Sequence, residues 1–219
     1  MADNLRIQKF DQTHQGHFHL KPDDDCYFLY EYTSHRDFTF SQTNQLIHNL
    51  KKSPLRKDRP EYRYKGQAIR QVASLFDSVL NEAWLNGATL VPVPPSKTKD
   101  HPEYDDRMTQ VCRLMRGGQA DVREIVKQKR SMDAAHTTGN RHSVDDLIEC
   151  YEIDETLCAP APRWIGIVDD VLTSGTHYRA MHTILSARFP KVKITGLFVA
   201  RRILPPVDYD AIFGDLEEI

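Results

Sequence analysis

The chain has 219 residues, a mass of 25.3 kDa and a net charge of −2 at neutral pH. This length allows one domain with a sizeable core and a small appended subdomain, because single cores extend to roughly 250 residues. The balanced charge gives no sign of the global basic excess of nucleic-acid-binding proteins, and no apolar run approaches the ~18 residues of a helical membrane span.

The four cysteines show no C-x-x-C spacing, and no secretory signal precedes them. They are Cys26, Cys112, Cys150 and Cys158. Disulfides persist in oxidising compartments, whereas scattered cysteines without a signal fit a reducing one. We therefore expect a cytoplasmic protein without a membrane segment.

Residues 1–25 are polar and end in a run of aspartates, so we expect an N-terminal arm that is loose or docked on the core. Three histidines fall close together there: His14, His17 and His19. They can bind a transition metal, but no cysteine or carboxylate of recognisable spacing accompanies them. A polar surface segment is the favoured interpretation, and we assign no metal. Residues 26–32, rich in aromatic side chains, predict a strand, and residues 44–51 predict a short helix.

Residues 51–65 form a basic stretch that prolines interrupt. Its cationic side chains are Lys51, Lys52, Arg56, Lys57, Arg59, Arg63 and Lys65, with Tyr62 and Tyr64 among them. Such a stretch can contact nucleic acid or a polyphosphate, because cations neutralise phosphates and aromatic rings stack on bases. A solvated linker is the favoured alternative, since runs of charge usually face water.

Residues 66–86 carry apolar side chains at helical spacing, and Gly87 is a suitable stop, so the sequence predicts one helix. Residues 88–93 predict a core strand. The turn after this strand contains Ser96, Lys97 and Lys99. Hydroxyls and ammonium groups at the carboxyl end of a strand suit a polyphosphate. The alternative is a plain strand-to-helix connection with solvated lysines.

The next segments are a predicted helix at residues 104–115 and a predicted strand at residues 122–126. Residues 127–141 have no hydrophobic repeat, hold four cationic residues and are long for a loop in a compact domain. Long loops often act as lids, which makes a lid the preferred interpretation over a disordered surface excursion. Residues 147–153 predict another short strand.

The segment at residues 163–179 carries the strongest signal. Residues 164–168 are a short apolar run, typical of a strand buried on both faces of a parallel sheet. Asp169 and Asp170 follow, and then Thr-Ser-Gly-Thr at residues 173–176, just before a predicted helix. Free N–H groups and the helix dipole make a helix N-terminus suitable for a phosphate, and small residues let the anion approach closely. Because carboxylates accept hydrogen bonds from sugar hydroxyls, these residues predict a sugar-phosphate site.

The run Val-Asp-Asp-Val-Leu-Thr-Ser-Gly-Thr at residues 168–176 resembles the phosphoribosyl diphosphate (PRPP) motif of type I phosphoribosyltransferases. It is similar to the orotate branch, because His177 stands where many other branches keep a hydroxyl. Across residues 66–200 the order of motifs resembles that of ComF-like proteins: a Val-Pro-Val-Pro strand end, an arginine, a basic loop closed by an arginine, and the acidic pair. The chain lacks a zinc-ribbon C-x-x-C pair, and the family's Arg-Gly-Phe-Asn-Gln phrase is reduced to Asp-Arg-Met at residues 106–108.

The resemblance implies a type I phosphoribosyltransferase fold of the α/β class, with a mainly parallel sheet flanked by helices and a small N-terminal or C-terminal hood or arm. It implies a hood segment at residues 1–65, a core at residues 66–200 and a tail near the acceptor at residues 201–219. In this fold the residues beyond the last predicted strand, at residues 191–200, approach the base. The candidate acceptor contacts are therefore Arg201, Arg202 and the region of Tyr209.

The implied reaction transfers 5-phosphoribosyl from PRPP to a nitrogen nucleophile, such as a base, and releases pyrophosphate. The residues implied for the ribose are Asp169 and Asp170, and those for the 5′-phosphate are Thr173, Ser174, Gly175, Thr176 and His177. Those implied for the pyrophosphate are Ser96, Lys97, Lys99 and Arg107, with Arg130 and Arg141 from the lid. Mg²⁺ would arrive with PRPP, so no dedicated protein site for the metal is expected.

Other interpretations stay open at this point. The same fold can serve as a binding module that senses PRPP or a nucleotide and regulates another process, with nucleic acid at residues 51–65. Transfer to an acceptor other than a free base, or hydrolysis of PRPP, is a third possibility. The aromatic strand near residues 27–32 can serve a homodimer as well as a hood.

Overall fold

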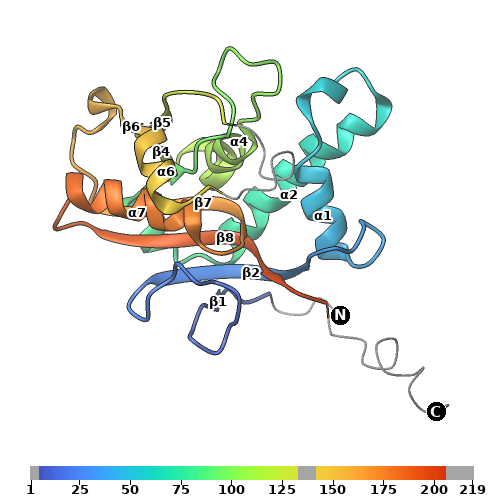
Figure 1. The fold of residues 1–219 in the computed structure, drawn as a ribbon, viewed down its shortest axis with the longest axis horizontal. Helices are drawn as coiled ribbons and strands as arrows, with labels where there is room; N and C mark the ends of the chain where they lie inside the picture. Colours follow the sequence, from blue (N-terminus) through green and yellow to red (C-terminus); the bar gives the residue numbers. More distant parts are fainter. Residues whose placement is uncertain (1–4, 133–141, 206–219) are drawn as a thin grey trace, which may run out of the picture.

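The main element of the fold is a six-stranded sheet with the order β1-β2-β8-β7-β3-β4 (Figure 1). The computed structural model describes residues 5–132 and 142–205. The strands are β1 (Gln8–Lys9), β2 (Asp25–Thr33), β3 (Ala88–Pro92), β4 (Asp121–Val122), β7 (Trp164–Leu172) and β8 (Lys193–Ile203). β1 is antiparallel to β2, and all other neighbouring pairs are parallel. The prediction of an α/β fold with a mainly parallel sheet is confirmed.

Helices cover the sheet. They are α1 (Gln42–Leu50), α2 (Arg63–Val79), α3 (Glu82–Gly87), α4 (Arg107–Leu114), α6 (Val144–Cys150) and α7 (Thr176–Arg188). Short 3-10 turns occupy Pro54–Arg56, Pro60–Tyr62, Met115–Gly118 and Glu155–Leu157, and a small antiparallel sheet joins β5 (Val126–Gln128) to β6 (Tyr151–Ile153). Among the described residues, no helix is both long and apolar enough to cross a membrane.

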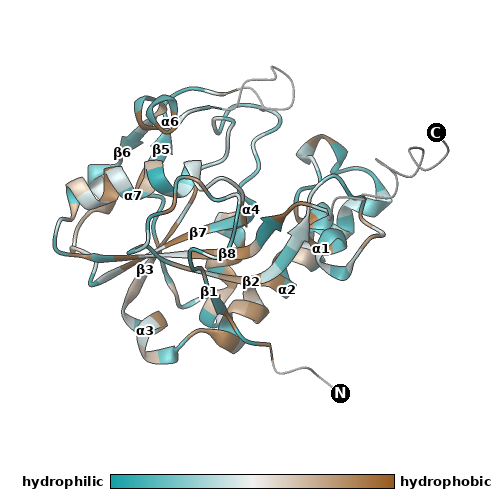
Figure 2. Cartoon of the chain, turned by 60° about the horizontal axis from the view of Figure 1, so that its bottom comes forward, coloured by the Kyte–Doolittle hydropathy of each residue, from teal (hydrophilic) through white to brown (hydrophobic). Residues whose placement is uncertain are grey.

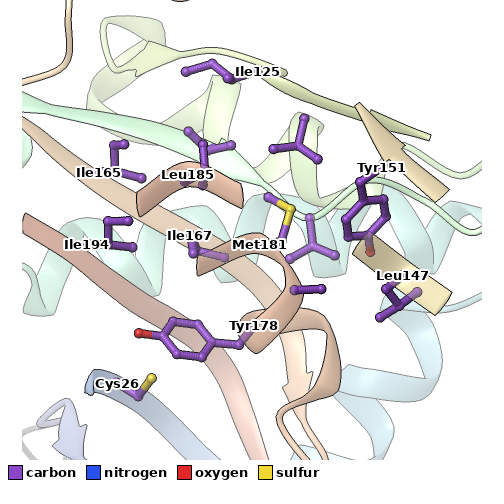
Figure 3. Close-up of a cluster of buried hydrophobic side chains, with 14 of the residues drawn as sticks. Cys26, Ile125, Leu147, Tyr151, Ile165, Ile167, Tyr178, Met181, Leu185 and Ile194 are labelled. Carbon is purple, nitrogen blue, oxygen red and sulfur yellow. The ribbon is translucent and has the colours of Figure 1, made fainter. Parts of the chain in front are cut away.

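Two hydrophobic cores lie on the two faces of the sheet. Side chains alternate along a strand, so Ile165 and Ile167 of β7 point to one face and Val168 to the other. The first core joins the sheet to α6, α7 and the small β5–β6 sheet, and Figure 3 shows Tyr178 and Met181 of α7 within it. The second core packs the other face against α1, α2 and α4. Figure 2 shows the hydrophobic residues of the strands at the centre of the molecule.

The first 65 residues share this sheet with the predicted core. β2 runs parallel to β8 from the Asp25–Thr195 pair to the Thr33–Ile203 pair, and β1 extends the sheet beyond β2. α2 begins at Arg63, so the predicted boundary after residue 65 falls inside this helix. The predicted strand at residues 26–32 is confirmed, but it is an inner strand of the sheet.

The prediction of one helix at residues 66–86 is wrong, because α2 and α3 are separate. Leu80 is extended, with φ −77° and ψ 142°, and ends α2. The side chain of Asn81 then accepts a hydrogen bond from Trp84 N at 3.0 Å and caps α3. Asparagine is among the best N-cap residues, since its side chain replaces the missing acceptor of a first-turn N–H group. The apolar spacing continued across this break and concealed it.

The predicted strand at residues 147–153 is wrong over most of its length. Residues 144–150 form α6, which a reciprocal capping box starts: Asp146 N donates to Ser143 Oγ at 3.1 Å, and Ser143 N donates to Asp146 Oδ2 at 2.8 Å. This Ser-x-x-Asp spacing is a helix-start signal that the strand interpretation overlooked. The strand β6 occupies only the last three residues of the predicted range.

The predicted strand at residues 122–126 is also two elements. β4 ends at Val122, beside β3, and Arg123 N donates to Leu90 O at 3.0 Å as the chain leaves the main sheet. β5 then begins at Val126 in the small sheet. The charged residues between them lie where the chain passes from one sheet to the other.

Candidate functional site

A hollow of about 620 Å³ lies at the carboxyl ends of β3 and β7, and we call it the first hollow. The residues that border it come from the end of α1, the loop after β3, the start of α4 and the end of β7. They are Lys51, Ser53, Pro54, Val93, Pro94, Pro95, Ser96, Lys97, Glu103, Asp105, Asp106, Arg107, Met108, Thr109, Asp169, Asp170, Val171, Thr173 and His177. The structure thus brings together residues from four distant parts of the sequence.

The two aspartates lie inside β7, whereas the sequence predicted a strand that ends at Val168. β3 pairs with β7 only as far as Val168, but β8 continues to pair with it through Leu172. The carboxylates therefore stand beyond the end of β3, at the edge of the first hollow. Adjacent side chains of a strand point to opposite faces, so Asp169 and Asp170 border the first hollow in different orientations.

Asp170 is buried and held by two cations. Arg107 donates to its Oδ2 atom from Nε at 2.8 Å and from Nη2 at 2.5 Å. Lys51 Nζ lies 3.0 Å from its Oδ1 atom. Burial opposes ionisation, but the charges of Lys51 and Arg107 hold the pKa of Asp170 below its usual range. The Asp170 carboxylate is thus ionised and saturated by the protein itself.

The ion pairs continue along the border of the hollow to Asp105 and beyond it to Lys65. Asp105 Oδ2 accepts hydrogen bonds from Arg107 Nη1 at 2.7 Å and from Lys65 Nζ at 2.8 Å. Lys65 also donates to Leu50 O at 2.8 Å and to Lys52 O at 2.9 Å, at the end of α1. Lys51, Asp170, Arg107, Asp105 and Lys65 therefore form one chain of alternating charges, which we call the charge chain.

The charge chain corrects the interpretation of residues 51–65 as a solvated linker. Lys65 is only 3% exposed, and Lys51 borders the first hollow. The other cationic residues of the stretch that lie between residues 56 and 63 are exposed. The prediction thus holds for the middle of the stretch and is wrong at Lys65, while the side chain of Lys51 is 44% exposed but pairs with Asp170.

Asp169 has a different environment from Asp170. It is half-buried, and its Oδ1 atom accepts a hydrogen bond from Asp170 N at 2.8 Å. Burial and the neighbouring Asp170 charge raise the pKa of Asp169 to about 7. Near it, Tyr151 Oη and His177 Nδ1 form a hydrogen bond of 2.9 Å. Desolvation lowers the pKa of His177 to about 4 and raises that of Tyr151, so Asp169 is the group among these three that titrates near neutral pH.

The loop from Thr173 to Gly175 leads into the N-terminus of α7. Gly175 has φ +86°, the left-handed conformation that glycine adopts without strain. The first N–H groups of an α-helix have no acceptor within the helix, which makes this end suitable for an anion. Thr173 and His177 border the first hollow, but Ser174, Gly175 and Thr176 do not. Ser174 Oγ and Thr176 Oγ1 are hydrogen-bonded to each other at 2.7 Å.

The N-terminal arm covers the other side of this loop. His19 N donates to Ser174 O at 3.0 Å, and His17 Nδ1 is hydrogen-bonded to Thr173 O. A side chain at Gly175 would collide with Leu20. His17 is 5% exposed, so the interpretation of all three histidines as part of a polar surface segment is wrong for this residue.

The predicted pyrophosphate loop is only partly at the first hollow. Ser96 and Lys97 border it, whereas Lys99 does not. Lys99 Nζ lies 3.5 Å from Glu124 Oε2, and both residues border an adjacent hollow that Lys97 also borders. The loop is tied to the start of the predicted lid, because Met132 N donates to Ser96 O at 2.8 Å and Thr98 N donates to Ser131 Oγ at 3.0 Å.

Other predicted site residues lie elsewhere. Arg130 is exposed and does not border the first hollow, and Arg141 lies outside the described residues, as does Tyr209. Arg201 and Arg202 border a separate hollow beside the N-terminal arm. In residues 5–132 and 142–205, no three histidine, cysteine, aspartate or glutamate side chains are grouped so as to hold a metal ion.

Comparison with models of known protein families and with curated proteins found no match to this chain. Sequence reasoning missed Lys51, Lys65 and Asp105 as parts of one arrangement, although it had noted the basic stretch. The only available signal was an unusual density of charge next to a helix end, which by itself does not identify a partner 40 or more residues away.

Proposed function

We propose that this chain is a PRPP-binding, phosphoribosyltransferase-like protein with a type I phosphoribosyltransferase fold. The observation that carries the proposal is the placement of Asp169 and Thr173, from the PRPP-like motif, on the border of one hollow with Lys97 and Arg107. A protein that binds a sugar phosphate needs carboxylates that accept hydrogen bonds from the sugar hydroxyls. It also needs hydrogen-bond donors for the phosphate and nearby cations. Asp169, Thr173, Lys97 and Arg107 border this hollow at the carboxyl ends of parallel strands, where α/β folds commonly bind ligands, and this supports the proposal.

The charges around the first hollow favour a ligand that arrives with a divalent cation. Five carboxylates and three cationic side chains border it, so a bare polyphosphate would meet an excess of negative charge. Glu103 and Asp106 carry oxygen ligands of the type that Mg²⁺ prefers. When bound with PRPP, Mg²⁺ would neutralise charge on the pyrophosphate group.

The residues of the chain would then divide the work of phosphoribosyl transfer. Thr173, just before α7, and His177, in its first turn, border the hollow and would hold the 5′-phosphate, and Asp169 would accept hydrogen bonds from the ribose hydroxyls. In its ionised form Asp169 would also stabilise a positively charging ribose ring. Lys97 and Arg107 would hold the departing pyrophosphate, while Asp105 and Asp170 keep Arg107 in place. The proposed transfer would depend on rigid positioning of both ends of the ligand, and it would need no covalent nucleophile from the protein.

A sensor that binds PRPP or a nucleotide without turnover is the second candidate. It is favoured by the saturation of Asp170, which leaves a single carboxylate of the pair for the sugar. Contact of residues 51–65 with nucleic acid or homodimer formation through β2 also stays a prediction. We further propose a cytoplasmic location, which suits the four unpaired, buried cysteines.

Release of pyrophosphate tests this proposal. The purified protein would be given PRPP, Mg²⁺ and a panel of bases, and both binding and pyrophosphate release would be measured. Binding with release supports the transferase, and binding without release for any base supports the sensor. Failure of PRPP to bind in the presence of Mg²⁺ would contradict both.

A further inference from the structure

One side of the molecule carries a local excess of positive charge. The cationic residues come from the loop after β2 and from the stretch that follows α1. Lys51 is left aside, because it pairs with Asp170. The others, which we call the basic face, are Arg36, Lys52, Arg56, Lys57, Arg59 and Arg63. Between residues 36 and 63 the acidic residues are Asp37, Asp58 and Glu61, so the cations exceed them, whereas the whole chain has a net charge of −2.

The cations of the basic face are open to a ligand. None of the six forms an ion pair with a carboxylate of the described chain. All except Lys52 are exposed, and Lys52 is partly exposed. The side-chain hydrogen bonds that they make go to neutral groups, Asn49 Oδ1 for Lys52 and Tyr64 Oη for Arg63. These charges therefore stay available to phosphate oxygens, which form strong, charge-assisted hydrogen bonds with them.

Hydrophobic side chains are exposed among these cations. Of the seven large hydrophobic side chains that are exposed in the described chain, four lie here: Phe38, Phe40, Leu55 and Tyr64. The three aromatic residues are between 38% and 52% exposed, so each rests partly on the protein and leaves part of its ring open. Arg36 lies 5.5 Å from the centre of the Phe40 ring, and Lys52 lies 5.9 Å from that of Tyr64. Rings next to cations suit a ligand with flat bases and phosphates, because bases stack on aromatic side chains.

A groove of about 320 Å³ lies within the basic face, and we call it the side groove. Arg36, Lys52 and Arg56 border it. The rings of Phe38 and His48 also border it, and their centres are 5.2 Å apart. Desolvation and then the charges of Lys52 and Arg56 lower the pKa of His48, so these cations act on the groove without a carboxylate that cancels them.

The side groove adjoins the first hollow, because Lys51 and Ser53 border both. Asp37 is the acidic residue among those described on the border of the groove. Its Oδ1 atom already accepts hydrogen bonds from Thr39 N at 2.8 Å and from Thr39 Oγ1 at 2.6 Å. An anionic strand that follows the groove therefore meets little negative charge before it reaches the first hollow.

We propose that the basic face binds single-stranded nucleic acid. Phosphates lie on the exposed cations, and bases stack on Phe38, Phe40 and Tyr64. A double helix keeps the flat faces of its bases covered, and a polyphosphate has no bases, so neither ligand uses the rings. An anionic membrane favours rings that protrude for insertion, whereas these rings rest partly on the protein. The proposal is independent of PRPP binding, although a strand in the side groove reaches the border of the proposed PRPP site.

The test measures the fluorescence anisotropy of a labelled oligothymidylate of about 12 nucleotides as the full chain is added at low salt. An oligouridylate of the same length distinguishes RNA from DNA, and binding of either strand supports the proposal. The competing occupants are represented by the same oligothymidylate in a duplex, by inorganic polyphosphate and by vesicles of phosphatidylglycerol.

Arg56→Gln with Lys57→Gln removes two exposed cations of the basic face. The matched control is Arg163→Gln with Lys191→Gln, which removes the same charges from exposed positions just before β7 and β8. Figures 1 and 2 show α7, which precedes Lys191, on the opposite side of the molecule from α1. We expect the first variant to weaken oligothymidylate binding by roughly tenfold, and the slope of log affinity against log salt to become shallower by about 1.4, because each phosphate contact of a single strand contributes about 0.7. The control should bind as wild type does.

Phe38→Ala tests stacking, and its control is Phe18→Ala, an exposed ring on the N-terminal arm. We expect Phe38→Ala to weaken oligothymidylate binding by roughly tenfold without a change in the salt slope, and to leave polyphosphate binding unchanged. Phe40→Ala is the second test of stacking if Phe38→Ala lowers thermal stability. No binding of either strand, equal binding of the duplex or the vesicles, equal losses in the charge variant and its control, or ring variants that bind as Phe18→Ala does would overturn the proposal.

Discussion

The carboxylate of Asp170 and the guanidinium of Arg107 are joined through two nitrogen atoms, at 2.8 Å and 2.5 Å, across 63 residues of sequence. Asp170 is 4% exposed, so this contact is a buried ion pair. Lys51 also pairs with Asp170, and Asp105 also pairs with Arg107, so each charge of the pair has a second partner of opposite sign. The pair fixes the start of α4 against the end of β7 and so shapes the first hollow.

Asp170→Asn should strongly destabilise the fold, because it leaves the largely buried guanidinium of Arg107 facing a neutral amide. Removal of one partner of a buried ion pair costs about 3–5 kcal/mol of the free energy of unfolding. Urea denaturation measures this loss. The control is Glu155→Gln, which breaks the exposed contact of Glu155 with Arg188 and should change stability little. Equal, small effects of both substitutions would show that the Asp170 pair is not buried in solution.

Asp169→Asn should change how stability depends on pH. The pKa of Asp169 is raised to about 7 in the folded protein from an ordinary value near 3.8, so the folded state holds a proton that the unfolded state releases. The free energy of unfolding therefore falls as pH rises from about 4 to 7, by an amount on the order of 2–4 kcal/mol. Asparagine cannot ionise and removes this fall.

The difference in the free energy of unfolding between wild type and Asp169→Asn, taken at each pH, separates the effect of Asp169 from that of other groups that titrate in the same range. Burial lowers the pKa of His17, and that shift acts in the opposite direction, because a neutral folded histidine gains stability as pH rises toward 6.5. Chemical denaturation at several pH values gives both curves. Parallel curves for wild type and Asp169→Asn would show that Asp169 ionises normally.

Lys65→Met should destabilise the protein by about 2–4 kcal/mol, because the acceptors Leu50 O, Lys52 O and Asp105 all lose a buried donor. The matched control is Lys57→Met in the same basic stretch, where the side chain is exposed. We expect no measurable change for the control. Thermal unfolding distinguishes the two variants, and a stable Lys65→Met protein would restore the linker interpretation of this stretch.

Gly175→Ala should loosen the N-terminal arm from the phosphate loop. A side chain at φ +86° costs about 1–2 kcal/mol, and its Cβ atom would also collide with Leu20. Limited proteolysis within residues 10–20 should therefore become faster. Adding Leu20→Ala removes the collision but leaves the backbone strain, so the double variant should recover part of the lost stability. No recovery would mean that the arm does not pack on Gly175.

The strands of the parallel sheet could be predicted because they are nearly unbroken apolar runs, as in residues 88–93 and 164–168. The break at Asn81 was hidden, since the apolar spacing of α2 continues into α3. The capping box at Ser143 was present in the sequence, but the apolar residues after it also fit a strand.

The site was predictable only in part. The PRPP-like motif identified Asp169, and the turn after β3 identified Lys97, because both signals are local in sequence. The saturation of Asp170 depends on Lys51 and Arg107, which only the packing of α1 and α4 on the sheet brings to it. Local patterns carry no information on such contacts, and the same is true of His17 against Thr173.

The most direct test of the account is a calorimetric titration of PRPP with Mg²⁺ into wild type, Lys97→Gln and Lys99→Gln. The two lysines lie two residues apart in one loop, but only Lys97 borders the first hollow, while Lys99 faces Glu124. We predict that wild type binds PRPP, that Lys97→Gln weakens binding by roughly tenfold, and that Lys99→Gln binds as wild type does. No binding by wild type, or an equal loss in both variants, would contradict the placement of PRPP in the first hollow.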